Sequence, residues 1–139
     1  MIRMLFVSLA LAALSIAGHA GETPSTPGAK VYFIGLEDGA TVTSPVTLRF
    51  GLSGMGVAPA GIDKAKTGHH HLIIDAPTPD PSMPIPADDK HRHFGGGQTQ
   101  VTLELPPGQH TLQLVLGDAA HVPHDPPVVS EVVTITVAD

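Results

Sequence analysis

The stretch QTQVTLELPPGQHTLQLVLGD (residues 98–118) decides the fold class of this chain of 139 residues. Apolar side chains occupy every second position on both sides of a central Pro-Pro-Gly: Val101, Leu103 and Leu105 before it, and Leu112, Leu114 and Leu116 after it. A period of two is typical of strands with one buried face. The Pro-Pro-Gly at 106–108 predicts a tight turn between two such strands.

The same β character extends outward from this stretch in both directions. Further strands are predicted at 30–36, 46–52, 69–75 and 128–137. No segment has a convincing helical period, and the only helical candidate is a turn within 60–66. The stretch 76–97 holds five prolines and three consecutive glycines, so it is predicted to be a long loop. About seven short strands in one domain predict an all-β fold, an immunoglobulin-like antiparallel β-sandwich.

Both ends of the chain resemble bacterial immunoglobulin-like domains. The resemblance is carried by VYFIGLEDGATVTSPVTLRFGL (31–52) and by LPPGQHTLQLVLGDAAH (105–121) with SEVVTITV (130–137). It implies a sandwich over residues 30–139, with an Asp-Gly turn after the first strand and a hairpin leading into the penultimate one.

A second resemblance covers the whole of the chain after residue 20. Five strings carry it: GMGVAPAG (54–61), TGHHHLIID (67–75), HFGGGQT (93–99), PPGQHTLQLVLGD (106–118) and HVPHDPP (121–127). They are similar to a family of small exported bacterial domains that has no established function, so the resemblance implies a folded unit and no particular chemistry.

The first twenty residues read as a signal peptide. Arg3 precedes an apolar run, and the small residues Gly18 and Ala20 stand at the −3 and −1 positions of a cleavage site. The alternative is a membrane anchor, but the run is short and nothing basic follows it. We therefore expect a signal peptide at 1–20, a flexible linker at 21–29 and a periplasmic or secreted domain at 30–139, with no stable membrane span after cleavage. The chain has no cysteine, so no disulfide supports the core.

The charge of the exported part argues against nucleic acid as a partner. Removal of Arg3 with the signal peptide leaves six basic against 13 acidic side chains. There is no basic patch to bind a phosphate backbone or an anionic membrane. The unusual residue is histidine, since eight of the nine histidines follow position 20.

The predicted topology gathers most of these histidines at one pole of the sandwich. Strand 69–75 starts there, strand 98–105 starts there, and the loop after strand 109–116 emerges there. The residues placed at this pole are His69, His70, His71, His91, His93, His121 and His124, together with Met55 and Asp118. His110 is placed at the opposite pole, where we expect a structural role.

Clustered imidazoles are typical ligands of zinc, copper, nickel and iron. Because alternate strand residues share a face, His69 and His71 can act together while His70 points toward the core with Leu72 and Ile74. His70 would then need a buried hydrogen-bond partner, either a backbone carbonyl or Asp118. The predicted metal ligands are His69, His71, His91, His93, His121 and His124, with His70, Met55 and Asp118 as secondary candidates.

The metal is expected to be copper or zinc. A thioether from Met55 or Met83 would favour copper, and three histidines with a water would suit zinc. The leading hypothesis is an exported copper or zinc carrier, buffer or sensor, and a periplasmic protein is a second candidate partner beside the metal ion. Two alternatives stay open: a redox enzyme with one metal ion, and a non-catalytic interaction or adhesion domain whose histidines respond to pH. No serine–histidine–carboxylate arrangement can be identified.

Overall fold

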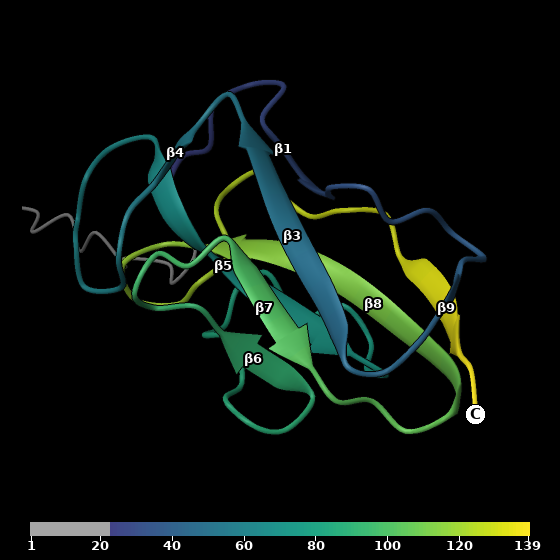
Figure 1. The fold of residues 1–139 in the computed structure, drawn as a ribbon. Coiled ribbons are helices and arrows are strands. Elements are labelled where there is room, and N and C mark those ends of the chain that lie inside the picture. The colour runs from purple at the N-terminus through teal and green to yellow at the C-terminus, as the bar shows by residue number, and fades with distance from the viewer. Residues whose placement is uncertain (1–22) are drawn as a thin grey trace, which may run out of the picture.

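The computed structural model describes residues 23–139, which fold into two packed β-sheets (Figure 1). The strands are β1 (Lys30–Phe33), β2 (Thr41–Val42), β3 (Val46–Ser53), β4 (Gly56–Val57), β5 (Thr67–Ile74), β6 (His91–His93), β7 (Gln100–Leu103), β8 (Gly108–Gly117) and β9 (Val133–Val137). These residues contain no helix, which confirms the predicted all-β class. The predicted signal peptide lies outside the described residues.

The two sheets have the topology of an immunoglobulin-like sandwich. One sheet has the order β1-β3-β7, and the other has the order β2-β9-β8-β5-β4, with β6 also paired to β5. All pairings between the longer strands are antiparallel, while the two-residue strands β2 and β4 add short parallel pairings. β7 pairs with β3 and not with β8. The turn at 106–108 therefore carries the chain from one sheet to the other, and the hairpin expected there is not formed.

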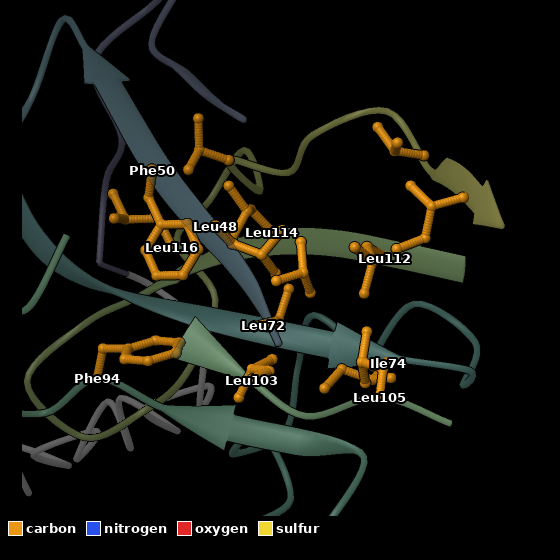
Figure 2. Close-up of a cluster of buried hydrophobic side chains, with 14 of the residues drawn as sticks. Leu48, Phe50, Leu72, Ile74, Phe94, Leu103, Leu105, Leu112, Leu114 and Leu116 are labelled. Atoms are coloured by element: carbon orange, nitrogen blue, oxygen red, sulfur yellow. The ribbon is translucent and has the colours of Figure 1, made fainter. Parts of the chain in front are cut away.

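The main core lies between the sheets, and the alternating residues of the opening stretch fill it (Figure 2). Leu112, Leu114 and Leu116 of β8 are fully buried and face Leu48 and Phe50 of β3. Burying each such side chain stabilises the fold by about 1.5–3 kcal/mol. The period of two in β8 therefore sets which face of the larger sheet is covered by the smaller one.

A second, smaller apolar cluster lies on the other face of the larger sheet. It consists of Ile73 from β5, Val115 from β8 and Ile85 from the proline-rich loop. Ile85 is only 3% exposed, although prolines and polar residues surround it in the sequence. This cluster fixes the loop of residues 76–90, named here the flap, against the outer face of β5.

The described part of the predicted linker is hydrogen-bonded to the loop after β8. The backbone nitrogen of Ser25 donates to the carbonyl of Asp125, and the backbone nitrogen of Asp125 donates to the carbonyl of Thr23. Within residues 23–139 no helix is long and apolar enough to cross a membrane.

Candidate metal centre

The candidate site is built on the outer face of β5, under the flap and the loop after β8. Strand alternation separates the three consecutive histidines as predicted. His70 faces the main core with Leu72, whereas His69 and His71 face outward with Ile73. All three imidazoles are nonetheless fully buried, because loops cover the outer face at this end of the strand.

The third member of the cluster, His121, comes from the loop after β8. Its backbone has φ of 65°, a left-handed conformation that is uncommon for residues other than glycine. The Asp118 carboxylate holds this turn: one oxygen accepts hydrogen bonds from the backbone nitrogens of Ala120 (2.8 Å) and Val122 (3.0 Å). Its other oxygen accepts from the Thr23 hydroxyl at 2.7 Å. Asp118 therefore positions His121 without entering the cluster.

Ring nitrogens of the three histidines converge. His121 Nδ1 lies 3.0 Å from His69 Nε2 and 3.3 Å from His71 Nε2. One atom from each residue can be chosen so that all three lie within 4.8 Å of one another. Two nitrogens bound to one zinc ion at about 2.0–2.1 Å in tetrahedral geometry are separated by about 3.3 Å. The observed separations thus suit ligands of a shared ion.

Hydrogen bonding alone leaves this arrangement poorly satisfied. An unprotonated Nδ1 has a single in-plane lone pair, so His121 accepts one good hydrogen bond and not two. In addition, the Nδ1 atoms of His69 and His71 are buried without a partner. Buried polar atoms normally have partners, and the exceptions require an explanation. A cation at the meeting point would engage the lone pairs of His69 Nε2, His71 Nε2 and His121 Nδ1, and it would leave the Nδ1 atoms of His69 and His71 without partners.

Gly117 provides the space in which the His71 ring lies. It sits opposite His69 in the β5–β8 register. A Cβ atom added to Gly117 would be 2.4 Å from Cε1 and 2.9 Å from Nδ1 of His71, which is far inside ordinary contact distance. The β8 strand therefore switches from large side chains to none at the point where it passes the cluster.

The electrostatic environment keeps the imidazoles neutral. Burial, followed by the neighbouring His121, lowers the pKa of His69 to about 4. Burial, followed by His69, lowers the pKa of His71 to about 2. The pKa of His121 is also lowered, first by burial and then by the neighbouring His93. Neutral imidazoles have the free lone pairs that metal binding requires.

The second predicted histidine pair, His91 and His93 on β6, is divided between two environments. His93 stands opposite His71 in the β5–β6 register, and the ring centroids of these two residues are 4.3 Å apart. His91 lies opposite Ile73, and its Nδ1 donates to the Asp88 carboxylate at 2.7 Å. The structure brings His93 to the edge of the cluster and leaves His91 outside it.

His124 and His110 are bonded to backbone carbonyls elsewhere. His124 is buried, and its Nε2 lies 3.0 Å from the carbonyl oxygen of Thr67. Its ring fills the space over Gly68 and links the loop to β5. At the opposite end of the sheet, His110 donates from Nε2 to the Pro106 carbonyl.

Three secondary candidates also lie apart from the cluster. His70 packs against Phe50 with a centroid distance of 5.4 Å, and neither of its ring nitrogens has a hydrogen-bond partner. Neither of the two partners considered for His70, a backbone carbonyl or Asp118, bonds to its ring, and the Asp118 carboxylate is occupied by its own loop and by Thr23. Met55 packs against the main core, and Met83 is 57% exposed. The donors that converge are therefore all imidazole nitrogens.

A family model described as Domain of unknown function (DUF4399) matches residues 48–138. The chain belongs to this family. The DUF4399 match begins inside β3 and includes β5, β6, β8 and the loop with His121, so the cluster lies wholly within the family's domain. The expectation of a small domain family without an assigned function is confirmed. No curated protein and no solved structure matches the chain.

Several residues that shape the site were missed by sequence reasoning. Gly117 ends an alternating strand, and that interruption of the pattern was a usable signal. Asp118 was expected at this pole as a secondary ligand, and what the sequence did not indicate was its bonding to the backbone nitrogens of its own loop. Thr23 bonds to Asp118 and Ile85 packs against Ile73, and both contacts join segments far apart in the sequence. No local sequence pattern predicts them.

Proposed function

We propose that this DUF4399 domain is an exported metal-binding module that carries, buffers or senses copper or zinc in the periplasm. The observation that supports it is the convergence of the His69, His71 and His121 nitrogens, with separations of 3.0 and 3.3 Å, in a buried site. Three converging lone pairs can share either a proton or a metal cation, and burial disfavours the protonated, positively charged form of histidine.

The choice of copper or zinc rests on donor chemistry. Imidazole suits late first-row transition metals, whereas magnesium and calcium prefer oxygen ligands. Since Met55 and Met83 are not brought to the converging nitrogens, the thioether argument for copper loses its basis, and zinc and copper are equal candidates. Export is supported by the signal-peptide pattern of residues 1–20, in which Arg3 precedes an apolar run and Ala20 ends a small-residue cleavage site.

The decisive experiment is elemental analysis and competitive metal titration of the chain purified without a histidine tag. We expect one copper or zinc ion per chain, and loss of that ion in the His69→Ala/His71→Ala variant. His110→Gln is the matched control, because it removes a histidine at the far end of the same sheet and should bind metal normally. Absence of tight binding of any late first-row ion by the wild-type chain would refute the proposal and favour the interaction-domain alternative.

A further inference from the structure

A fourth histidine lies against the cluster. The His93 ring centroid is 4.3 Å from that of His71 and 4.7 Å from that of His121. His93 is not in the group of three whose ligand atoms lie within 4.8 Å of one another. Its ring is nevertheless closer to His71 than the His121 ring is, since that centroid distance is 5.5 Å. A modest movement of the His93 ring would therefore bring a nitrogen to the meeting point.

The hydrogen bonding of His93 identifies which nitrogen is free. Nε2 donates to the carbonyl oxygen of Pro86 at 2.7 Å, so in the neutral ring the proton is on Nε2 and the lone pair is on Nδ1. Histidines that bind metal almost always donate their other ring N–H to a carbonyl or carboxylate, which fixes the tautomer and raises the basicity of the ligand. His93 has this arrangement, whereas the Nδ1 atoms of His69 and His71 have no partner.

The same dipeptide of the flap also holds His121. The backbone nitrogen of Ile85 donates to the His121 carbonyl at 2.8 Å, next to the Pro86 carbonyl that accepts from His93. The Ile85 side chain is buried with Ile73, so the dipeptide is anchored to β5 itself. Ile85 and Pro86 thus hold His93 of β6 and His121 of the loop after β8 beside the two histidines of β5.

We propose that His93 supplies a fourth ligand through Nδ1 and closes the coordination sphere around a divalent late transition metal ion. The inference rests on the proposed function and narrows the choice of metal ion and of role. Structural zinc sites are filled by four protein ligands, whereas catalytic sites keep a position open for water or substrate. Four imidazoles would favour Zn²⁺ or Cu²⁺ over the softer Cu⁺ and would make the domain a binding protein, not an enzyme that activates water.

The first test uses the wild-type chain alone and counts its ligands. X-ray absorption of the Zn²⁺-loaded protein should show four nitrogen donors at one distance, with the outer-shell pattern of four imidazoles. Three imidazoles with a water oxygen would overturn the inference and leave the proposed function standing. Failure of the protein to bind zinc or copper at all would instead refute the proposed function.

The second test compares His93→Gln with His91→Gln. His91 is a matched control because it lies on the same strand, is partly exposed like His93 and also donates a ring nitrogen to a loop oxygen. We expect His93→Gln to weaken Zn²⁺ binding by at least about 10–100-fold, which is the usual loss when a group that only orients a ligand is removed. His91→Gln should stay within about threefold of the wild type, with urea unfolding of the metal-free variants showing that both are folded. Equal zinc affinity of the two folded variants would overturn the inference.

Discussion

Replacement of Gly117 by alanine tests whether the gap at this glycine is what allows His71 to join the cluster. The added Cβ would stand 2.4 Å from His71 Cε1, and ordinary contact begins at 3.4 Å. The ring must therefore move by about 1 Å, while distances to a bound metal are held within about 0.2 Å. We expect metal affinity to fall by at least about 10–100-fold, as when a group that positions a ligand is lost.

The variant should also be less stable without metal. Forcing an extra methyl group into a packed site costs about 1–3 kcal/mol. Urea unfolding measures this cost, and competition with a chromophoric chelator measures the affinity. Gly56→Ala is the matched control, because its Cβ would lie 3.5 Å from the nearest atom, a Thr67 methyl, and it should leave both quantities unchanged.

A double-mutant cycle separates a clash with His71 from a general effect on β8. If the clash is the cause, Gly117→Ala should cost almost nothing in urea unfolding once His71 is already alanine. A Gly117→Ala protein that binds metal as tightly as the wild type would refute the packing argument. So would a cost that persists in full in the His71→Ala background.

Three further outcomes follow from the structure. His110 Nδ1 lies 2.7 Å from the Asp75 carboxylate, and the hydrogen bond between them raises the pKa of His110 above 6.5. Lys90 is a further charged neighbour of Asp75. Partial burial opposes ionisation of Asp75, but the hydrogen bonds that it accepts lower its pKa below 3.8 overall. The pair therefore stabilises the fold most between about pH 4 and 6.5 and loses its effect as pH rises through the folded pKa of His110. His110→Gln should destabilise by about 0.5–1 kcal/mol in urea unfolding at pH 5.5 and by less at pH 9, and an equal cost at both values would contradict this. Leu114→Ala should cost about 2–5 kcal/mol in the same assay, because Leu114 is fully buried between the sheets, and a cost below 1 kcal/mol would count against that core. Asp118→Ala should lower stability by about 1–3 kcal/mol and weaken zinc binding in the chelator assay, while unchanged binding would show that the loop keeps its shape without the carboxylate.

The fold was largely readable from the sequence because its signal is local. Alternation in β3 and β8 reports which side chains are buried, and that periodicity holds wherever one face of a strand is covered. The placement of His70 opposite His69 and His71 follows from the same rule. The predicted hairpin at 106–108 failed because a turn sequence fixes a change of direction and does not choose the sheet that the next strand joins.

The candidate centre was only partly readable. Spacing placed His69 and His71 on one face, but spacing cannot tell which loop histidine will reach them. His121 and His124 lie three residues apart in one loop, and His121, which has a left-handed backbone, places its ring in the cluster. His124 is drawn away by the carbonyl of Thr67 on β5. These choices depend on contacts between distant segments, which no single stretch of sequence contains.

β5 carries two different sets of side chains on its opposite faces: His70, Leu72 and Ile74 face the core between the sheets, and His69, His71 and Ile73 face the loops outside them. Within residues 67–74, substitutions at odd and even positions should thus be able to accumulate separately during evolution. Insertion or deletion of a single residue would exchange the two faces at once, moving Leu72 to the face under the loops and turning both His69 and His71 toward the core. Among relatives, we expect amino-acid substitutions in β5 but no insertions or deletions within it.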